Sequence, residues 1–64
     1  MYKNNLELVQ AMIKTAREKQ GSSLSDIAKQ TTIERSQLYR WIEGSVLSVR
    51  SKSVHLVAKG LGFF

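Results

Sequence analysis

The chain has 64 residues, of which ten are Lys or Arg and five are Asp or Glu, so its formal net charge is +5. Residues 1–64 are enough for one domain but not for a deep catalytic pocket, and we expect a protein that is not an enzyme. With no cysteine and one histidine, the sequence excludes disulfides, thiol catalysis and a structural zinc site, and we expect no metal or cofactor. The excess of basic residues favours polyanionic partners, because cations release the counterions condensed on phosphate backbones.

The apolar runs are only a few residues long, and residues 1–5 lack the basic region and hydrophobic core of a secretion signal. We therefore expect a cytoplasmic protein, associated with the nucleoid if it binds DNA, and no membrane partner. Charge alone does not distinguish nucleic acid from an anionic membrane, so a membrane-active basic amphipathic peptide is kept as the weakest alternative.

The first predicted helix begins near Leu6. Asn4 or Asn5 can cap its start, and Gly21 suits the left-handed backbone conformation that ends many helices. Apolar residues recur in it at spacings of three and four residues and form one face, which consists of Leu6, Val9, Ile13 and Ala16.

Two short helices are predicted next. Ser23 and Asp26 have the spacing of a capping box, in which the serine caps the helix and the acid bonds back to the serine N–H. This helix is about two turns long and gives way at Thr31 and Thr32, because β-branched residues favour leaving a helix. The following helix spans roughly residues 34–43, and its apolar face consists of Leu38, Trp41 and Ile42.

The last predicted helix follows a looser stretch at residues 45–51. Gly60 and Gly62 are expected to fray its end. Its apolar face consists of Val54, Val57, Ala58 and Leu61. No repeat, linker or strand-like alternation is visible except a short one at residues 46–49, so the sequence predicts an all-α domain.

Two short helices joined by a tight turn at about residues 23–43, with the small Ala28 at the helix crossing, have the layout of a helix-turn-helix. Here the sequence resembles the phage-repressor and Cro-type (Xre-like) helix-turn-helix family over about residues 22–63. The matching phrases are Leu24-Ser25-Asp26-Ile27-Ala28-Lys29-Gln30 with Ile33, Leu38-Tyr39-Arg40-Trp41 with Glu43-Gly44, and Val57-Ala58-Lys59-Gly60-Leu61-Gly62-Phe63. The resemblance implies a lambda-repressor-like domain of four or five helices that binds double-stranded DNA, regulates transcription and usually acts as a dimer.

The sequence departs from the family pattern at three points. Thr32 occupies a turn position that is most often glycine, so it must accept a left-handed backbone at a steric cost or use a different turn. Leu24 stands where the family often has a glutamine that touches the DNA backbone. Many relatives continue past the last phrase into a helix that helps to form the dimer, which leaves the oligomeric state open.

If the third helix enters the major groove, its outward face meets the bases. The base-reading candidates are Arg35, Ser36, Gln37, Tyr39 and Arg40, with Arg35 first and Arg40 second because an arginine fork matches guanine O6 and N7. Glu34 is expected to cap the helix rather than to read a base. The candidate phosphate contacts are Ser22, Ser23, Ser25 and Lys29 near the second helix, and Arg50 and Lys52 beyond the third.

Two other ring-bearing side chains are not among the candidate DNA contacts. Trp41 is expected in the core, because it falls on the apolar face with Leu38, and the lone His55 is expected at the surface or its boundary. The candidate residues for a partner or dimer interface are Leu61, Phe63 and Phe64, since two adjacent phenylalanines do not both fold back easily and an exposed apolar patch often marks an interface.

Two classes of function remain. The first is a sequence-specific DNA-binding regulator, a small Cro-like repressor of a phage or mobile element that acts alone or as a homodimer and takes no small-molecule substrate. The alternative is a helix-turn-helix modulator or antirepressor that binds a partner repressor protein. The missing glutamine and the hydrophobic tail motivate this alternative.

Overall fold

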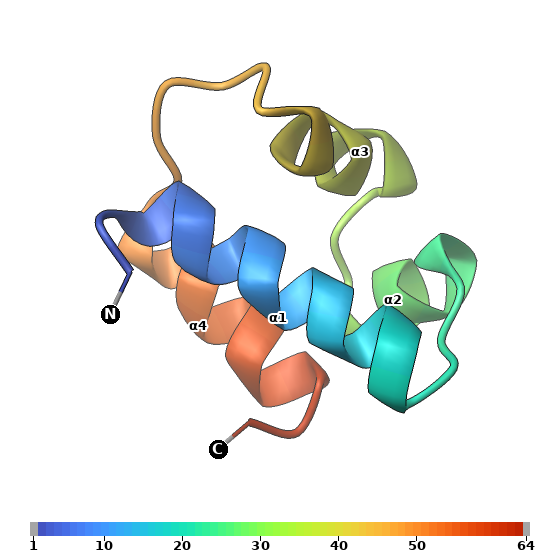
Figure 1. Ribbon diagram of the computed structural model, residues 1–64. Helices are drawn as coiled ribbons and strands as arrows, with labels where there is room; N and C mark the ends of the chain where they lie inside the picture. Colours follow the sequence, from blue (N-terminus) through green and yellow to red (C-terminus); the bar gives the residue numbers. More distant parts are fainter. Residues whose placement is uncertain (1, 64) are drawn as a thin grey trace.

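The structure is a computed structural model that describes residues 2–63. It contains four α-helices and no strand within these residues: α1 (Asn5–Lys19), α2 (Leu24–Thr31), α3 (Arg35–Glu43) and α4 (Ser51–Gly60). α1 and α4 lie side by side, α3 packs against α1 and α2, and α2 also packs against α4 (Figure 1). The prediction of an all-α domain is confirmed.

The first two helices begin as their sequences predict. Asn4, rather than Asn5, caps α1, because its side-chain oxygen accepts the Glu7 N–H at 2.9 Å. At α2 the Ser23 hydroxyl accepts the Asp26 N–H at 3.2 Å, and the Asp26 carboxylate accepts the Ser23 N–H at 3.1 Å. The capping box is therefore present in both directions.

The start of α3 differs from the expectation. Glu34 occupies the N-cap position, but its side chain makes no cap hydrogen bond. Only its backbone oxygen takes part, by accepting the N–H groups of Gln37 at 3.0 Å and Leu38 at 3.1 Å. The expectation that the Glu34 side chain caps the helix is wrong, because the short side chains of Ser, Thr, Asp and Asn are the ones that reach the first free N–H groups.

The end of α4 also differs from the expectation, because it is closed rather than frayed. The Phe63 N–H donates to the Ala58 oxygen at 2.8 Å and the Gly62 N–H donates to the Lys59 oxygen at 3.3 Å, so two carbonyls of the last turn have partners. Gly62 has the positive φ of 81° that this arrangement needs. Gly60 stays helical and packs against the backbone at the end of α2.

The core lies where the four helices meet. Val9 and Ile13 of α1, Ile27 of α2 and Val57 of α4 are almost completely buried, as the apolar spacing predicts. The other buried apolar residues are Met12, Ala16, Leu38, Trp41, Val49, Ala58 and Leu61. Trp41 is 4% exposed, which confirms its expected place in the core.

Side-chain amides in and just after α1 donate hydrogen bonds to backbone oxygens of other segments. Asn5 Nδ2 donates to the Val49 oxygen at 2.8 Å, and Gln10 Nε2 donates to the Trp41 oxygen at 2.7 Å. Gln20, just after α1, donates through Nε2 to the Leu61 oxygen at 3.3 Å. α1 therefore holds the loop before α4, the end of α3 and the end of α4 in fixed positions.

No helix within residues 2–63 has the length and apolar character needed to cross a membrane.

Candidate nucleic-acid interface

The two faces of α3 have opposite characters. Leu38 is fully buried and points into the core with Trp41. The opposite face is exposed and carries Arg35, Ser36, Tyr39 and Arg40. These positions fall together because residues one helical turn apart share a face, and the ring of Tyr39 is 54% exposed. Four of the five base-reading candidates therefore lie on one outward surface.

Gln37 is the exception among these candidates. It is half-buried and lines a shallow hollow together with Val49, Arg50 and Ser53, on the flank of α3 that faces the start of α4. The structure does not bring Gln37 onto the outward face with the other four. It does bring Gln37 close to Arg50, one of the phosphate candidates.

The start of α2 lies beside the start of α3. Arg35 Nη1 donates to the Ser25 hydroxyl oxygen at 3.4 Å, which joins a base-reading candidate to a phosphate candidate. These two residues line a hollow with Ser23, Leu24, Tyr39 and Arg17. Its six lining residues come from three helices and from the cap of α2.

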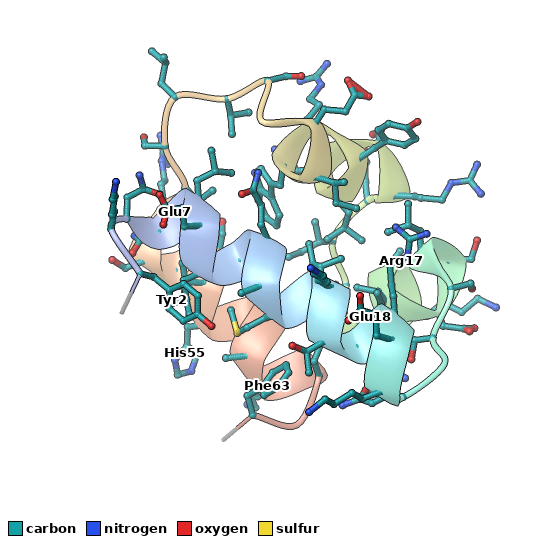
Figure 2. The ribbon with its side chains drawn as sticks, in the orientation of Figure 1. Tyr2, Glu7, Arg17, Glu18, His55 and Phe63 are labelled. Carbon is teal, nitrogen blue, oxygen red and sulfur yellow. The ribbon has the colours of Figure 1, made fainter. Side chains whose placement is uncertain are left out.

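Arg17 is the residue of this hollow that the sequence did not single out. It lies in the last turn of α1, where the sequence indicates only a solvated charged face. Figure 2 shows its side chain rising from the C-terminal part of α1 towards α2 and α3. No sequence pattern could have found it, because its position depends on how α1 crosses the pair α2 and α3.

The remaining phosphate candidates occupy different places. Arg50 is the N-cap residue of α4 and Lys52 lies in its first turn, and both side chains are exposed. Ser22 is half-buried, and Ser23 is already engaged in the capping box. Lys29 is exposed in the last turn of α2, at the opposite end of that helix from Ser23.

The carboxylate of Asp26, which follows Ser25 in α2, is engaged in the capping box. The backbone N–H of Ser23 and then its hydroxyl hold the pKa of Asp26 below its ordinary value of 3.8, and the charge of Lys29 acts in the same direction. Asp26 is therefore ionised at neutral pH and satisfied within the capping box.

The three interface candidates near the end of the chain differ in their exposure to solvent. Leu61 is 4% exposed and belongs to the core, so it is not available to a partner in this fold. Phe63 is 42% exposed and lines a shallow hollow with Tyr2 and with Leu8, Ala11, Met12 and Thr15 of α1. Figure 2 shows Tyr2, His55 and Phe63 on the same side of the molecule, away from α3. Phe64 lies outside the described residues.

Within residues 2–63, no group of three His, Cys, Asp or Glu side chains gathers in a way that could hold a metal ion. His55 is exposed on α4.

Comparisons of this chain with models of protein families, with curated proteins and with solved structures found no match. The function is therefore inferred from the arrangement of the chain's own residues.

Proposed function

We propose that this protein is a sequence-specific DNA-binding regulator of transcription in which α3 is the helix that enters the major groove. The observation that carries the proposal is the outward face of α3, where Arg35, Ser36, Tyr39 and Arg40 are exposed together. Residues 32–34 join α2 to α3 in the layout of a helix-turn-helix, and the motifs resemble those of the phage-repressor and Cro-type family. We propose the lambda-repressor-like version of the four-helix fold on the same grounds.

The dimensions of α3 suit this role. Its nine residues correspond to a length of about 14 Å, and a helix about 10–12 Å across fits a major groove about 12 Å wide. The two arginines on its outward face can each donate two hydrogen bonds to O6 and N7 of a guanine. Ser36 and Tyr39 are exposed on the same face, and their hydroxyl groups can form further hydrogen bonds.

Groups that can bind phosphate flank α3 on both sides. Ser25 and Arg17 line the hollow at one flank, and Arg50 lines the hollow at the other. The segment from residue 44 to residue 64 contains no Asp or Glu, so the loop and α4 add positive charge without compensation. Contacts of this type fix the orientation of a protein on the duplex, while the face of α3 reads the sequence.

A homodimer is the form in which we propose that the protein acts. One helix-turn-helix offers few contacts, whereas two copies can read half-sites about 34 Å apart on the same side of the duplex. Phe63 and Tyr2 form an exposed apolar surface away from α3 and are available for such an association. The role that fits is a small Cro-like repressor.

The proposal is tested by enrichment of bound sequences from a random duplex pool, with the mass of the complex recorded. We expect a short motif, palindromic if two copies bind. Arg35→Ala or Arg40→Ala should relax the preference at one base pair, at a cost of about 1–3 kcal/mol for the preferred base. Lys52→Ala should lower the affinity for all sequences alike. It should also reduce, by about one unit, the slope of the logarithm of the binding constant against the logarithm of the salt concentration.

The matched control for these variants is Lys59→Ala, which removes an exposed charge from the last turn of α4. It should change neither the motif nor the salt dependence to a comparable extent. Binding that depends on salt but enriches no motif would contradict sequence-specific reading. If Arg35→Ala lowered the affinity for every sequence equally, Arg35 would be a phosphate contact, as its hydrogen bond to Ser25 permits.

A second candidate function is a modulator that binds a partner repressor protein. The exposed rings of Phe63 and Tyr2, which are 42% and 55% exposed, favour it. The two functions are distinguished by comparing removal of residues 63–64 with replacement of Arg35 and Arg40 by Ala. Loss of regulation only in the shortened chain would support the modulator, and loss only in the arginine variant would support DNA reading.

A further inference from the structure

We propose that a groove between α1 and the C-terminal part of α3 binds an acidic, amphipathic helix of a partner protein, and that this partner excludes DNA. The groove has a volume of about 600 Å³ and is lined by Gln10, Ile13, Lys14, Arg17, Glu18 and Ile42. Five of these side chains belong to α1, on the flank of that helix opposite the hollow of Tyr2 and Phe63. The binding is independent of the function proposed above, and only the exclusion of DNA rests on it.

The floor of the groove is apolar and held in place. Ile13 is 1% exposed, and Ile42 is half-buried beside it. The Gln10 side chain donates to the Trp41 oxygen at 2.7 Å, which fixes α1 against the end of α3. A groove that is already formed costs a ligand less free energy to fill than one that must be ordered on binding.

The rim of the groove is mainly basic. Lys14 and Arg17 are exposed, and among residues 2–63 neither is engaged in a hydrogen bond or an ion pair. Glu18 is the one acid among the lining residues. Two available cations above an apolar floor are complementary to carboxylates placed next to apolar side chains.

A short helix fits this combination of size and charge. From Gln10 to Glu18 the groove follows α1 for about 12 Å, or about two helical turns. A helix in a groove uses apolar anchors spaced three, four and seven residues apart, and these would lie over Ile13 and Ile42. A nucleic-acid backbone offers no apolar group for this floor, whereas the apolar face of a helix does.

The position of Arg17 connects the groove to the proposed DNA surface. Arg17 lines both the groove and the neighbouring hollow that contains Arg35 and Tyr39. A partner helix that pairs with Arg17 and continues beyond the groove would cover these two residues of α3. The partner and DNA would then compete for the same surface.

The experiment is a titration of the ¹⁵N-labelled protein with a capped synthetic peptide of about twelve residues made of Leu and Glu, with Leu at helical spacing. A second peptide keeps every Glu and replaces Leu by Ala. We expect amide shifts at Gln10, Ile13, Lys14, Arg17 and Ile42, and affinity lower by about tenfold for the second peptide. Equal binding of both peptides, or shifts centred on Tyr2 and Phe63, would overturn the proposal.

Two charge-reversed variants provide the matched comparison. Lys14→Glu with Arg17→Glu changes the rim, and Lys3→Glu with Lys59→Glu changes the net charge equally at exposed sites outside the groove. Circular dichroism checks that both variants keep their helices. The rim variant should lose about tenfold in affinity, and the other should change far less because exposed charges outside the site contribute little. Equal losses would show that net charge alone attracts the peptide.

The exclusion of DNA is tested with the duplex selected under the proposed function. Displacement of a labelled duplex by the Leu and Glu peptide supports competition, and a complex that holds both peptide and duplex contradicts it. If no duplex is selected, the proposed function fails by that result alone. The peptide titration still decides whether the groove binds a helix.

Discussion

Gly60 lies in the last turn of α4, where this helix meets the end of α2. A Cβ atom at residue 60 would stand 2.6 Å from the Gln30 oxygen and 2.8 Å from the Cα of Thr31. Both are backbone atoms, so the contact is relieved only if one helix moves. The residue that suggests a frayed end in the sequence is the one that lets α4 approach α2.

We therefore expect Gly60→Ala to destabilise the protein by about 1–3 kcal/mol, the usual cost of overpacking. This is expected although alanine has the higher helix propensity, by about 1 kcal/mol. Urea denaturation followed by circular dichroism measures the change. Lys59→Ala, at the exposed neighbouring position, should stay within about 0.5 kcal/mol of the wild type. A Gly60→Ala variant as stable as the wild type would show that α2 and α4 do not touch here.

Thr32 is the non-glycine residue with positive φ within residues 2–63, at 60° with ψ at 21°. A left-handed backbone costs a residue with a Cβ about 1–2 kcal/mol. The turn between α2 and α3 is left-handed at Thr32 in spite of this cost. Because Thr32 Oγ1 also donates to the Thr31 oxygen, its hydroxyl and its Cβ must be tested separately.

Thr32→Ala removes the hydroxyl and keeps the Cβ, whereas Thr32→Gly removes both. We expect the Gly variant to be more stable than the Ala variant by about 1 kcal/mol, because only glycine relieves the strain. The comparison is made from unfolding midpoints in urea at equal m-values. Equal stability of the two variants would mean that the turn at residue 32 is not left-handed in solution.

At the scale of a single element, α2 depends on its capping box. Its eight residues are too few for a helix that is stable by itself in water. The reciprocal bonds between Ser23 and Asp26 satisfy two N–H groups at its start. α3 has no corresponding side-chain cap at Glu34, so its start is held by packing, by backbone bonds and by the bond from Arg35 to Ser25.

The capping box makes stability depend on pH in one direction. Because the N–H and hydroxyl of Ser23 lower the pKa of Asp26 below 3.8, ionised Asp26 stabilises the folded state above this value. The stabilisation is lost as the pH falls below 3.8 through the lower pKa of the folded protein. Asp26→Asn should therefore reduce stability at neutral pH, and the difference from wild type should shrink in acid.

Thermal unfolding at several pH values measures this difference. Glu34→Gln is the matched control, because it removes a carboxylate at a helix start where no side-chain cap bond exists. A stability difference between wild type and Asp26→Asn that stayed constant down to strongly acid pH would contradict the capping role of the ionised carboxylate.

At the scale of the whole molecule, α1 and α2 each pack against the other three helices, and α1 is the longer of the two. Its amides at Asn5 and Gln10 bind backbone oxygens of the loop before α4 and of α3. The apolar faces of α2 and α3 are completed by residues such as Ile13 and Val57 from the two longer helices. The pair α2 and α3 is therefore part of a larger core.

We expect a synthetic peptide of residues 22–45, which contains α2 and α3, to show little helix by circular dichroism. Helices of eight and nine residues fall below the roughly 12–15 residues at which isolated helices become marginally stable. The full chain under the same conditions should show all four helices. A peptide as helical per residue as the full chain would show that the pair folds without α1 and α4.

The sequence by itself determined the helices and their inner faces. Apolar spacing predicted the buried positions of α1 and α4, and the Ser23 and Asp26 pair predicted the start of α2, because these features depend on residues within one or two turns of each other. It also predicted that Arg35, Ser36, Tyr39 and Arg40 of α3 face outward, since Leu38 and Trp41 are buried, but it did not predict the half-buried place of Gln37.

Only the tertiary structure decided how these surfaces combine. The approach of Gly60 to Gln30 and the place of Arg17 beside Arg35 join residues from different helices. The bond from Gln10 to the Trp41 oxygen and the groove beside it have the same origin. Such contacts depend on helix crossing angles, and these are set by the packing of all four helices together rather than by the spacing within any one of them.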